Sequence, residues 1–321
     1  MRRGRGTTWW WTGLVLGLTL CAGSAVAGGG QHYPNGAEDF VVGALPPPGV
    51  YFKNYLVYIN KDRLMDNEGK KTPVEFDASV FAAIPRFIWV SPYKILGASW
   101  GAHVFIPFYT ADVEVTAQTP GGPLKVVNDS DGGLGDIIFS PFILGWHFGP
   151  NFHAVFAVDI WAPTGNYDNE DVSTQLLSRN HWTFEPVFAA TYLWNGFDFS
   201  VKLMYDFNTT NDEYLVPDGA GGMKEVDLDP GQEFHFDWAV GWSPKPGWRF
   251  GVNGFYYWQT TDDEIDGTED PNRSRLAAIG PGLKWWPNQG RFSVVAKQLW
   301  EFDGKNMPEG SSTWINVVWV F

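Results

Sequence analysis

The sequence predicts an all-β fold: a transmembrane antiparallel β-barrel of about twelve strands with both termini in the periplasm. Three observations predict it: a secretory signal, alternation of aromatic and polar residues, and alternation of short and long connections. The composition agrees, because aromatic residues make up 17% of the chain, with 18 Trp and 24 Phe, yet the mean hydropathy is only −0.19. A barrel with lipid outside and water inside has this mixture, since apolar and polar positions alternate along every strand.

Residues 1–27 have the features of a cleaved signal peptide. Three arginines lie within the first five residues, an apolar run covers 9–22, and Ala25-Val26-Ala27 fits a cleavage site. A transmembrane helix is the alternative, but the run is too short to cross ~30 Å of hydrocarbon at about 1.5 Å per residue. The single cysteine, Cys21, would leave with this segment. The mature chain would then hold no disulfide, no Cys-ligated metal and no Cys nucleophile.

The predicted barrel occupies residues 49–321. Alternation is clearest in 197–208, 232–242 and 291–302, where aromatic or aliphatic residues occupy every second position. Because successive side chains of a strand point to opposite faces, such segments have one lipid face and one lumen face. The predicted strands are 49–60, 74–90, 93–116, 132–149, 152–163, 180–194, 197–210, 231–243, 248–260, 272–286, 290–302 and 311–321.

The connections between these strands alternate in length. The short ones are Ser91-Pro92, Gly149-Pro150-Asn151, Asn195-Gly196, 244–247 and 287–289, all rich in turn-forming residues. The long ones are 61–73, 117–131, 164–179, 211–230, 261–271 and 303–310. Bacterial barrels have short periplasmic turns, long outer loops and an even number of strands. This alternation therefore places both termini in the periplasm.

Acidic residues are concentrated in the long loops after residue 163, and the whole chain has a formal net charge of −14. This charge excludes nucleic acid as a partner, because phosphate binding requires clustered Lys and Arg. It favours a solvated rim next to outer-membrane lipid and lipopolysaccharide, bridged by divalent cations. The last strand ends at Phe321 with apolar residues at alternate positions before it. This ending resembles the signal that the barrel assembly machinery recognises.

Several motifs occur in a characteristic order. They are Leu45-Pro46-Pro47-Pro48-Gly49, Gly133-Leu134-Gly135-Asp136-Ile137, Ala162-Pro163-Thr164-Gly165-Asn166-Tyr167, Trp182-Thr183-Phe184-Glu185-Pro186 and Gln259-Thr260-Thr261-Asp262-Asp263. Their order over residues 32–321 resembles the MetA-pathway of phenol degradation family, a group of outer-membrane channels. The resemblance implies passage of small hydrophobic or aromatic molecules, and it carries over no catalytic residues.

Alternation directs a mixed set of charged and polar side chains into the lumen. The predicted set is Glu75, Asp77, Ser99, His103, Asp136, Glu185, Asp198, Lys202, Asp206, Asp237, Arg249, Asn253, Lys297 and Glu301. We expect the solute path to be formed by Lys202, Arg249 and Lys297 facing Glu185 and Asp237, with Tyr257 near the mouth. Purely structural pairing of these charges is the alternative, because confined charges are costly unless they are paired or hydrated.

Residues 28–48 precede the first predicted strand and fit either a plug inside the lumen or a periplasmic tail. Catalysis is not expected, because none of the histidines lies in a His-x-Ser pair and Gly-x-Ser-x-Gly is absent from the sequence. No metal set at ligand spacing and no cofactor motif is recognised either. The sequence thus predicts a passive channel in the cell outer membrane for small hydrophobic or aromatic molecules. The alternative is a non-conducting structural or adhesive barrel that acts through its acidic outer loops.

Overall fold

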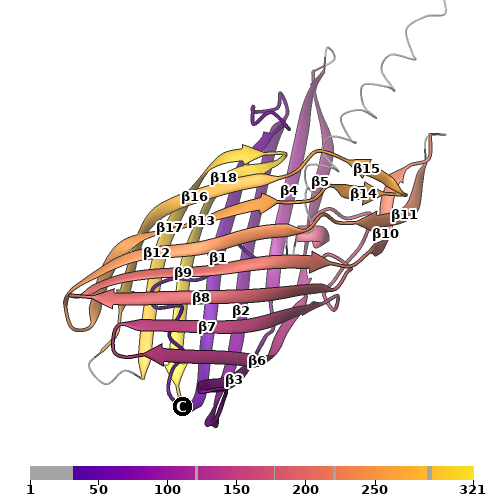
Figure 1. Ribbon diagram of the computed structural model, residues 1–321. Helices are drawn as coiled ribbons and strands as arrows, with labels where there is room; N and C mark the ends of the chain where they lie inside the picture. Colours follow the sequence, from indigo (N-terminus) through magenta and orange to yellow (C-terminus); the bar gives the residue numbers. More distant parts are fainter. Residues whose placement is uncertain (1–31, 120–121, 177, 220–221, 288–290) are drawn as a thin grey trace, which may run out of the picture.

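The computed structural model describes residues 32–119, 122–176, 178–219, 222–287 and 291–321. The predicted signal peptide, with Cys21, and residues 28–31 lie outside the described residues. The wall of the molecule consists of β1 (Gly49–Met65), β2 (Glu75–Ile95), β3 (Ala98–Phe105), β4 (Phe108–Thr119), β5 (Gly122–Leu134), β6 (Ile137–Phe148), β7 (Phe152–Ala162), β8 (Thr183–Trp194), β9 (Phe197–Asn208), β12 (Glu233–Lys245), β13 (Trp248–Gln259), β16 (Arg275–Trp285), β17 (Phe292–Lys305) and β18 (Met307–Val320) (Figure 1).

These strands form one closed antiparallel sheet. Its order is β1-β18-β17-β16-β13-β12-β9-β8-β7-β6-β3-β2-β4-β5, and β1 also pairs with β2, which closes the barrel. The labels β3 and β4 are two halves of one wall strand, interrupted at Ile106-Pro107, and β5 and β6 are halves of another, interrupted at Gly135-Asp136. Proline cannot donate to the sheet, which explains the first break. The 14 labelled strands therefore make 12 wall strands, and the predicted closed antiparallel barrel of about twelve strands is confirmed.

The two ends of the barrel differ, and we name them the turn end and the loop end. The turn end carries most of the tight connections, such as Asn195-Gly196, whose positive φ angles of 47° and 81° suit a two-residue hairpin. One predicted turn was misplaced: β2 continues through Ser91-Pro92 and turns at Leu96-Gly97. The first and last wall strands meet here, where the Phe321 amide donates to the carbonyl of Val50 at 3.2 Å.

The loop end holds strands that the sequence analysis did not predict. Two connections expected to be irregular contain β10 (Asn211–Pro217) and β11 (Met223–Asp229), and β14 (Asp263–Ile265) and β15 (Thr268–Asp270). They form a separate four-stranded sheet, here called the loop sheet, in which β11 pairs with β14. The predicted loop 303–310 is wrong as well, since only Asn306 separates β17 from β18. Its positive φ of 52°, which asparagine tolerates, allows this tight turn.

Successive residues along a wall strand lie alternately on the outer and the inner surface of the barrel. In β9, Phe199 and Phe207 are exposed on the outside, whereas Lys202 and Asp206 are buried inside. The predicted inward positions of Glu75 and Asp77 are wrong: both side chains are exposed, and Phe76 and Ala78 are buried instead. The reason is that β4 and β5 extend beyond the neighbouring strands at the loop end (Figure 1). Side chains of β2 that point outward next to β4 and β5 can therefore contact water. A charged residue at such a position does not show that the position faces the lumen.

A short 3-10 helix, η1 (Thr174–Leu176), lies in the connection between β7 and β8. Among the described residues, none of the helical segments has the length and apolar character needed to cross a membrane.

Candidate functional site

Residues 32–45, within the described part of the amino-terminal segment, lie inside the barrel and are here called the inner segment (Figure 1). Its backbone amides donate to wall side chains: Val41 to Ser200 on β9 at 3.0 Å, and Gly43 to Thr191 on β8 at 2.9 Å. On the far side of the lumen, Asn316 of β18 donates to the carbonyl of Ala37 at 3.1 Å. Because β9 and β18 lie on different sides of the closed sheet, the segment spans the lumen.

Asp237 on β12 is the main anchor of the inner segment. Its carboxylate accepts hydrogen bonds from the Tyr33 hydroxyl at 2.7 Å, the Gly36 amide at 2.8 Å and the Glu38 amide at 2.9 Å. The side chain is buried, so these three donors replace its hydration. Hydrogen bonds to a charged group contribute about 1.5–3 kcal/mol each. The sequence analysis placed Asp237 in the lumen opposite cations, whereas these three donors all belong to the inner segment.

Glu38 connects the same segment to the opposite wall. Its carboxylate accepts from Lys53 at 2.7 Å and Tyr55 at 2.9 Å, both on β1, and from Arg86 on β2 at 3.1 Å. Lys53 also lies 3.5 Å from Asp39 of the segment. All of these side chains are buried or half-buried. The inner segment is thus held between a carboxylate on β12 and two cations on β1 and β2.

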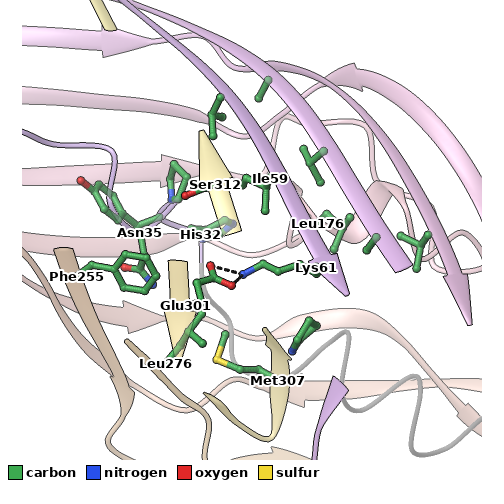
Figure 2. A pocket seen from close by; sticks show the side chains of 18 of the residues that line it. His32, Asn35, Ile59, Lys61, Leu176, Phe255, Leu276, Glu301, Met307 and Ser312 are labelled. Carbon is green, nitrogen blue, oxygen red and sulfur yellow. Dashed lines mark hydrogen bonds and ion pairs between the residues drawn. The ribbon is translucent and has the colours of Figure 1, made fainter. Parts of the chain in front are cut away.

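The inner segment separates two cavities. The loop-end cavity, of about 150 Å³, lies beyond Tyr33, Pro34 and Asn35. Its wall is largely aliphatic or aromatic, and Figure 2 shows these side chains converging around the Lys61–Glu301 ion pair of 2.5 Å. The apolar lining residues are Val57, Ile59, Phe76, Ala78, Val80, Ala82, Ile84, Val113, Leu176, Phe255, Leu276 and Met307. The lumen is therefore apolar on the side formed by β1, β2 and β4, where the sequence analysis expected a polar lining.

The turn-end cavity lies on the other face of the inner segment and has a volume of about 360 Å³. Residues 38–42 and 44–46 form one side of it. Charged side chains of both signs line it: the basic Lys53, Arg86, Lys202 and Lys284, and the acidic Glu38, Asp39 and Asp159. Its electrostatic character therefore differs from that of the apolar loop-end cavity.

The six predicted path residues all lie in the barrel interior, but they are not gathered at one place. Lys202 faces Glu185 as expected, with Nζ 3.9 Å from Oε1. Arg249 instead pairs with Asp198 at 2.6 Å, near the turn end. Lys297 donates to the backbone carbonyl of Glu38 at 2.5 Å.

Tyr257, the sixth of these residues, is fully buried. Its hydroxyl donates to Glu233 at 2.8 Å. It therefore serves as a hydrogen-bond donor in the interior, away from solvent.

A row of buried carboxylates crosses neighbouring strands, and sequence reasoning recognised only its middle members. Asp159 on β7 stands opposite Glu185 on β8, and Asp206 on β9 stands opposite Glu233 on β12. The hairpin of β8 and β9 gives a usable signal, because Glu185 and Asp206 lie equally far from the Asn195-Gly196 turn. Counting residues in both directions from this turn would have placed Glu185 and Asp206 opposite each other on the two strands. The other two carboxylates were not singled out from the sequence.

Three of the sequence motifs meet at Asp136. Its carboxylate accepts from the amides of Thr164 at 3.0 Å and Gly165 at 2.9 Å, and it lies 2.8 Å from Nε2 of His32. Nδ1 of His32 in turn lies 2.7 Å from the hydroxyl of Thr183. A Cβ at Gly165 would lie 2.9 Å from backbone of the second motif, so only glycine fits. The motifs thus fix the start of the inner segment against the wall.

The comparisons with known proteins agree with this architecture. The family model described as "Putative MetA-pathway of phenol degradation" matches residues 61–317, most of the chain. The chain belongs to this family. As a phenol-degradation MetA family member with a closed barrel of 12 strands, it is a protein of the cell outer membrane. No curated protein matches the sequence.

Among solved structures, this family member is similar to the COG4313 outer membrane channel from Pseudomonas putida F1. The identity is 17%, the TM-score is 0.67, and the match covers 91% of this chain and 100% of the other. A TodX monoaromatic hydrocarbon channel mutant matches with 12% identity, a TM-score of 0.46 and coverage of 92% and 97%. The transport unit of the autotransporter AIDA-I from Escherichia coli has 10% identity, a TM-score of 0.47 and coverage of 95% and 98%. At these identities the likeness to the first structure supports the fold alone.

Proposed function

We propose that this protein is an outer-membrane channel for small hydrophobic or aromatic molecules and that the inner segment is its plug. The observation that carries the proposal is the apolar loop-end cavity, which ends at Tyr33, Pro34 and Asn35. Membership of a phenol-degradation family and the shared fold with an outer membrane channel of Pseudomonas putida point in the same direction.

The cavity suits a single aromatic ring. An apolar cavity of about 150 Å³ lined by aliphatic and aromatic side chains stays dry and can bind benzene. The loop-end cavity has this volume, and its lining is mostly of this kind, around the Lys61–Glu301 ion pair. A strongly hydrated solute would exchange its water there mostly for apolar side chains, which is unfavourable. The lining therefore favours apolar solutes over sugars or ions at this step of the path.

Passage requires the inner segment to shift, because it lies between the loop-end and turn-end cavities. Once it moves, Asp237 and Lys297 lose their partners in the segment and become part of the lumen surface. Together with Glu185, Lys202, Arg249 and Tyr257, they would line the polar section of the path. The solute would then diffuse passively, down its gradient, from an apolar to a charged part of the lumen.

Orientation and partners complete the proposal. We place the turn end and both termini in the periplasm, and the acidic loop sheet outside, next to lipopolysaccharide. The exposed Phe321 side chain at the end of the chain would be read by the barrel assembly machinery. The cleaved signal peptide, residues 1–27, would direct export.

Single-channel conductance in planar bilayers tests the proposal. The mature protein, beginning at residue 28, is compared with a variant that lacks residues 32–45. The expected result is a small or rare conductance in the first and a larger, steady one in the second. Heat-modifiable migration in gels shows that both are folded barrels. Absence of conductance in both folded forms would contradict the channel and support the non-conducting structural or adhesive barrel.

A further inference from the structure

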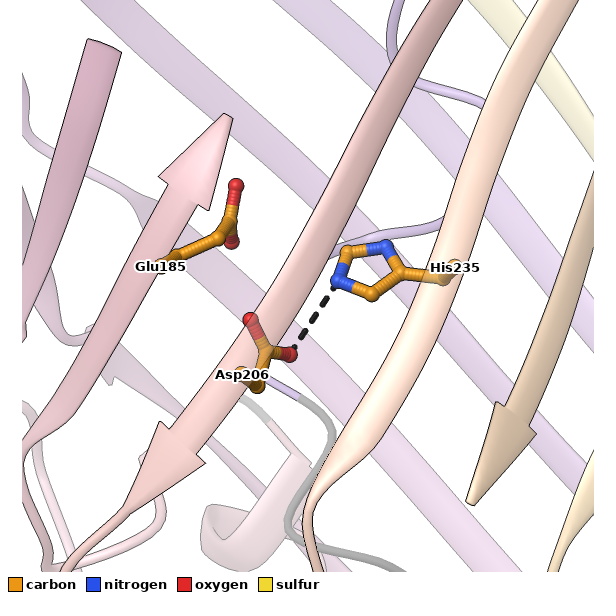
Figure 3. A group of neighbouring side chains, drawn as sticks. All are labelled: Glu185, Asp206 and His235. Atoms are coloured by element: carbon orange, nitrogen blue, oxygen red, sulfur yellow. Dashed lines mark hydrogen bonds and ion pairs between the residues drawn. The ribbon is translucent and has the colours of Figure 1, made fainter. Parts of the chain in front are cut away.

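Three ionisable side chains on adjacent strands point toward one another in the lumen. They are Glu185 on β8, Asp206 on β9 and His235 on β12 (Figure 3). One ligand atom from each lies within 4.8 Å of the other two, and all three residues are fully buried. Among the residues that the structure describes, no second group of three His, Cys, Asp or Glu residues meets this condition.

Buried atoms in this cluster lack hydrogen-bond partners. Asp206 accepts at Oδ2 from Nε2 of His235 at 3.1 Å, but its Oδ1 has no donor. Oε1 of Glu185 also has no donor; the nearest cation to it is Nζ of Lys202, at 3.9 Å. Nδ1 of His235 is unpartnered too. Buried polar atoms in folded proteins are almost always satisfied, so the unsatisfied carboxylate oxygens of Asp206 and Glu185 indicate a missing partner.

The charge of the surroundings points to a cation as that partner. Glu233 lies opposite Asp206, and its Oε2 has no donor either. Asp159 lies opposite Glu185 on the other side, so negative groups occupy four neighbouring strands. Several anions in a dry interior are costly unless cations or protons compensate them. A single divalent cation between Glu185 and Asp206 would compensate two of these negative charges.

We propose that Glu185, Asp206 and His235 form a binding site for a divalent transition metal such as Zn²⁺. Bond lengths to Zn²⁺ of about 2.0–2.2 Å place neighbouring ligand atoms about 3–3.5 Å apart. Nε2 of His235 and Oδ2 of Asp206, at 3.1 Å, already meet this spacing. The ligand atom of Glu185, within 4.8 Å of the other two, needs to move closer to them, giving up its contact with Lys202 at 3.9 Å. One imidazole with two carboxylates favours Zn²⁺ over Mg²⁺ or Ca²⁺, which prefer oxygen ligands alone.

The site adjoins the inner segment. The ring of Tyr33 lies 5.1 Å from the ring of His235, and Nζ of Lys202 lies 4.5 Å above the Tyr33 ring. A bound ion would fix the His235 ring beneath Tyr33 and leave a fourth coordination position for water from the lumen. The site goes beyond the proposed channel, since it would hold metal whether or not a solute passes.

Direct metal binding to the refolded full-length barrel tests this proposal. The protein is stripped with chelator, titrated with Zn²⁺ by calorimetry, and assayed for retained zinc after gel filtration. The expected stoichiometry is one zinc per barrel. His235→Gln and Asp206→Asn each remove a ligand and should weaken zinc binding by at least about 100-fold. Loss of a residue that only orients a metal ligand already costs up to about 100-fold, so loss of a ligand should cost no less. With Co²⁺ as probe, the visible absorption band of the wild-type complex should be absent in both variants.

The matched control is His103→Gln. His103 is also a buried histidine, 3.0 Å from the carboxylate of Asp159, but this pair lacks a third convergent ligand. This variant should retain zinc and the cobalt spectrum. The proposal is overturned if folded wild-type protein holds no zinc, or if His235→Gln binds zinc as tightly as wild type. Glu185→Gln provides a third ligand variant, so that misfolding of one substitution does not decide the result.

Discussion

The hydroxyl of Tyr33 lies 2.7 Å from Oδ2 of Asp237, although 204 positions separate the two residues in the chain. This bond ties the amino-terminal segment to the middle of the wall strand β12. The same carboxylate also accepts two backbone amides of the segment. Because one side chain holds three donors, the position of the inner segment depends strongly on a single residue.

The first prediction concerns this carboxylate. Asp237→Ala leaves three donors without their acceptor, which costs about 1–3 kcal/mol for each donor left unsatisfied. We expect the inner segment to detach more often and the open fraction in single-channel recordings to rise at least tenfold. Tyr33→Phe removes only one bond and should have a smaller effect in the same direction. Unchanged open fractions in both folded variants would show that Asp237 does not hold the plug.

The second prediction concerns Glu38. In Glu38→Gln, Lys53 and Arg86 lose their nearest carboxylate while remaining buried or half-buried. Breaking a buried ion pair on one side costs about 3–5 kcal/mol. Hydrogen exchange of the amides of residues 36–43 should therefore become faster. The control is Glu68→Gln, which removes an exposed pair with Lys70 and should leave this exchange unchanged.

The third prediction separates hydrophobic passage from ion passage. Ile59 lines the loop-end cavity from β1, and Ile59→Asp places a charge among aliphatic side chains. Uptake of toluene by cells that display the protein should fall at least tenfold. The same substitution made in the variant that lacks residues 32–45 should reduce the ion conductance of that variant far less, because an apolar wall does not stabilise ions. Ile59→Val keeps the lining apolar and should retain uptake; equal uptake in all three proteins would place the hydrophobic path elsewhere.

The fourth prediction is a pH dependence of the loop sheet. Burial raises the pKa of Asp263 to about 6; a bond from the Gly231 amide opposes the rise, and the nearby Asp270 adds to it. The pKa of Asp263 in the folded protein lies above the unfolded value of about 3.9. The protonated side chain therefore contributes to the stability of the folded sheet below pH 4, and this contribution to the free energy of unfolding is lost as pH rises through 6. At about 1.4 kcal/mol per pKa unit, the loss is at most about 3 kcal/mol.

Asp263→Asn should therefore stabilise the loop sheet above pH 6 and change little at pH 4. Both hydrogen bonds to this side chain, from Gly231 and Gln259, are accepted by Oδ1, which asparagine keeps. Slower hydrogen exchange of residues 223–229 at pH 7.5, relative to wild type at the same pH, is the measurement. Glu269→Gln on the exposed β15 should show no such change with pH. Equal exchange of Asp263→Asn and wild type at pH 7.5 would contradict the prediction.

Much of the barrel could be predicted from the sequence because alternation and turn chemistry are local signals. The pattern in 197–208 and the Asn195-Gly196 turn identify β8, β9 and their inner faces directly. Charge failed as a guide at Glu75, since an outward position beyond the membrane also meets water. The loop sheet was missed because its strands are short and pair between two different connections.

The lumen site was predicted only in part, for a physical reason. Alternation indicates that Arg249 points inward, but its partner Asp198 is decided by the register between strands and by side-chain packing. The role of Asp237 depends on the inner segment, whose path through the lumen has no periodic signal. Glu185, Asp206 and His235 belong to three strands, so no spacing within one segment reveals them.

The pairing of β11 with β14 has a consequence for how this surface can be engineered. Leu228 stands opposite Ile265 in this pairing, which links two successive hairpins above the wall. An epitope tag or a reporter peptide placed in either hairpin would perturb both, and exchanging one hairpin with that of a relative would require exchanging the other. The turn between β1 and β2 is linked to its neighbours in the same way, because the Asn306 amide donates to the carbonyl of Asp66 and Asn67 donates to Asn272, so an insertion there would also reach the next connections.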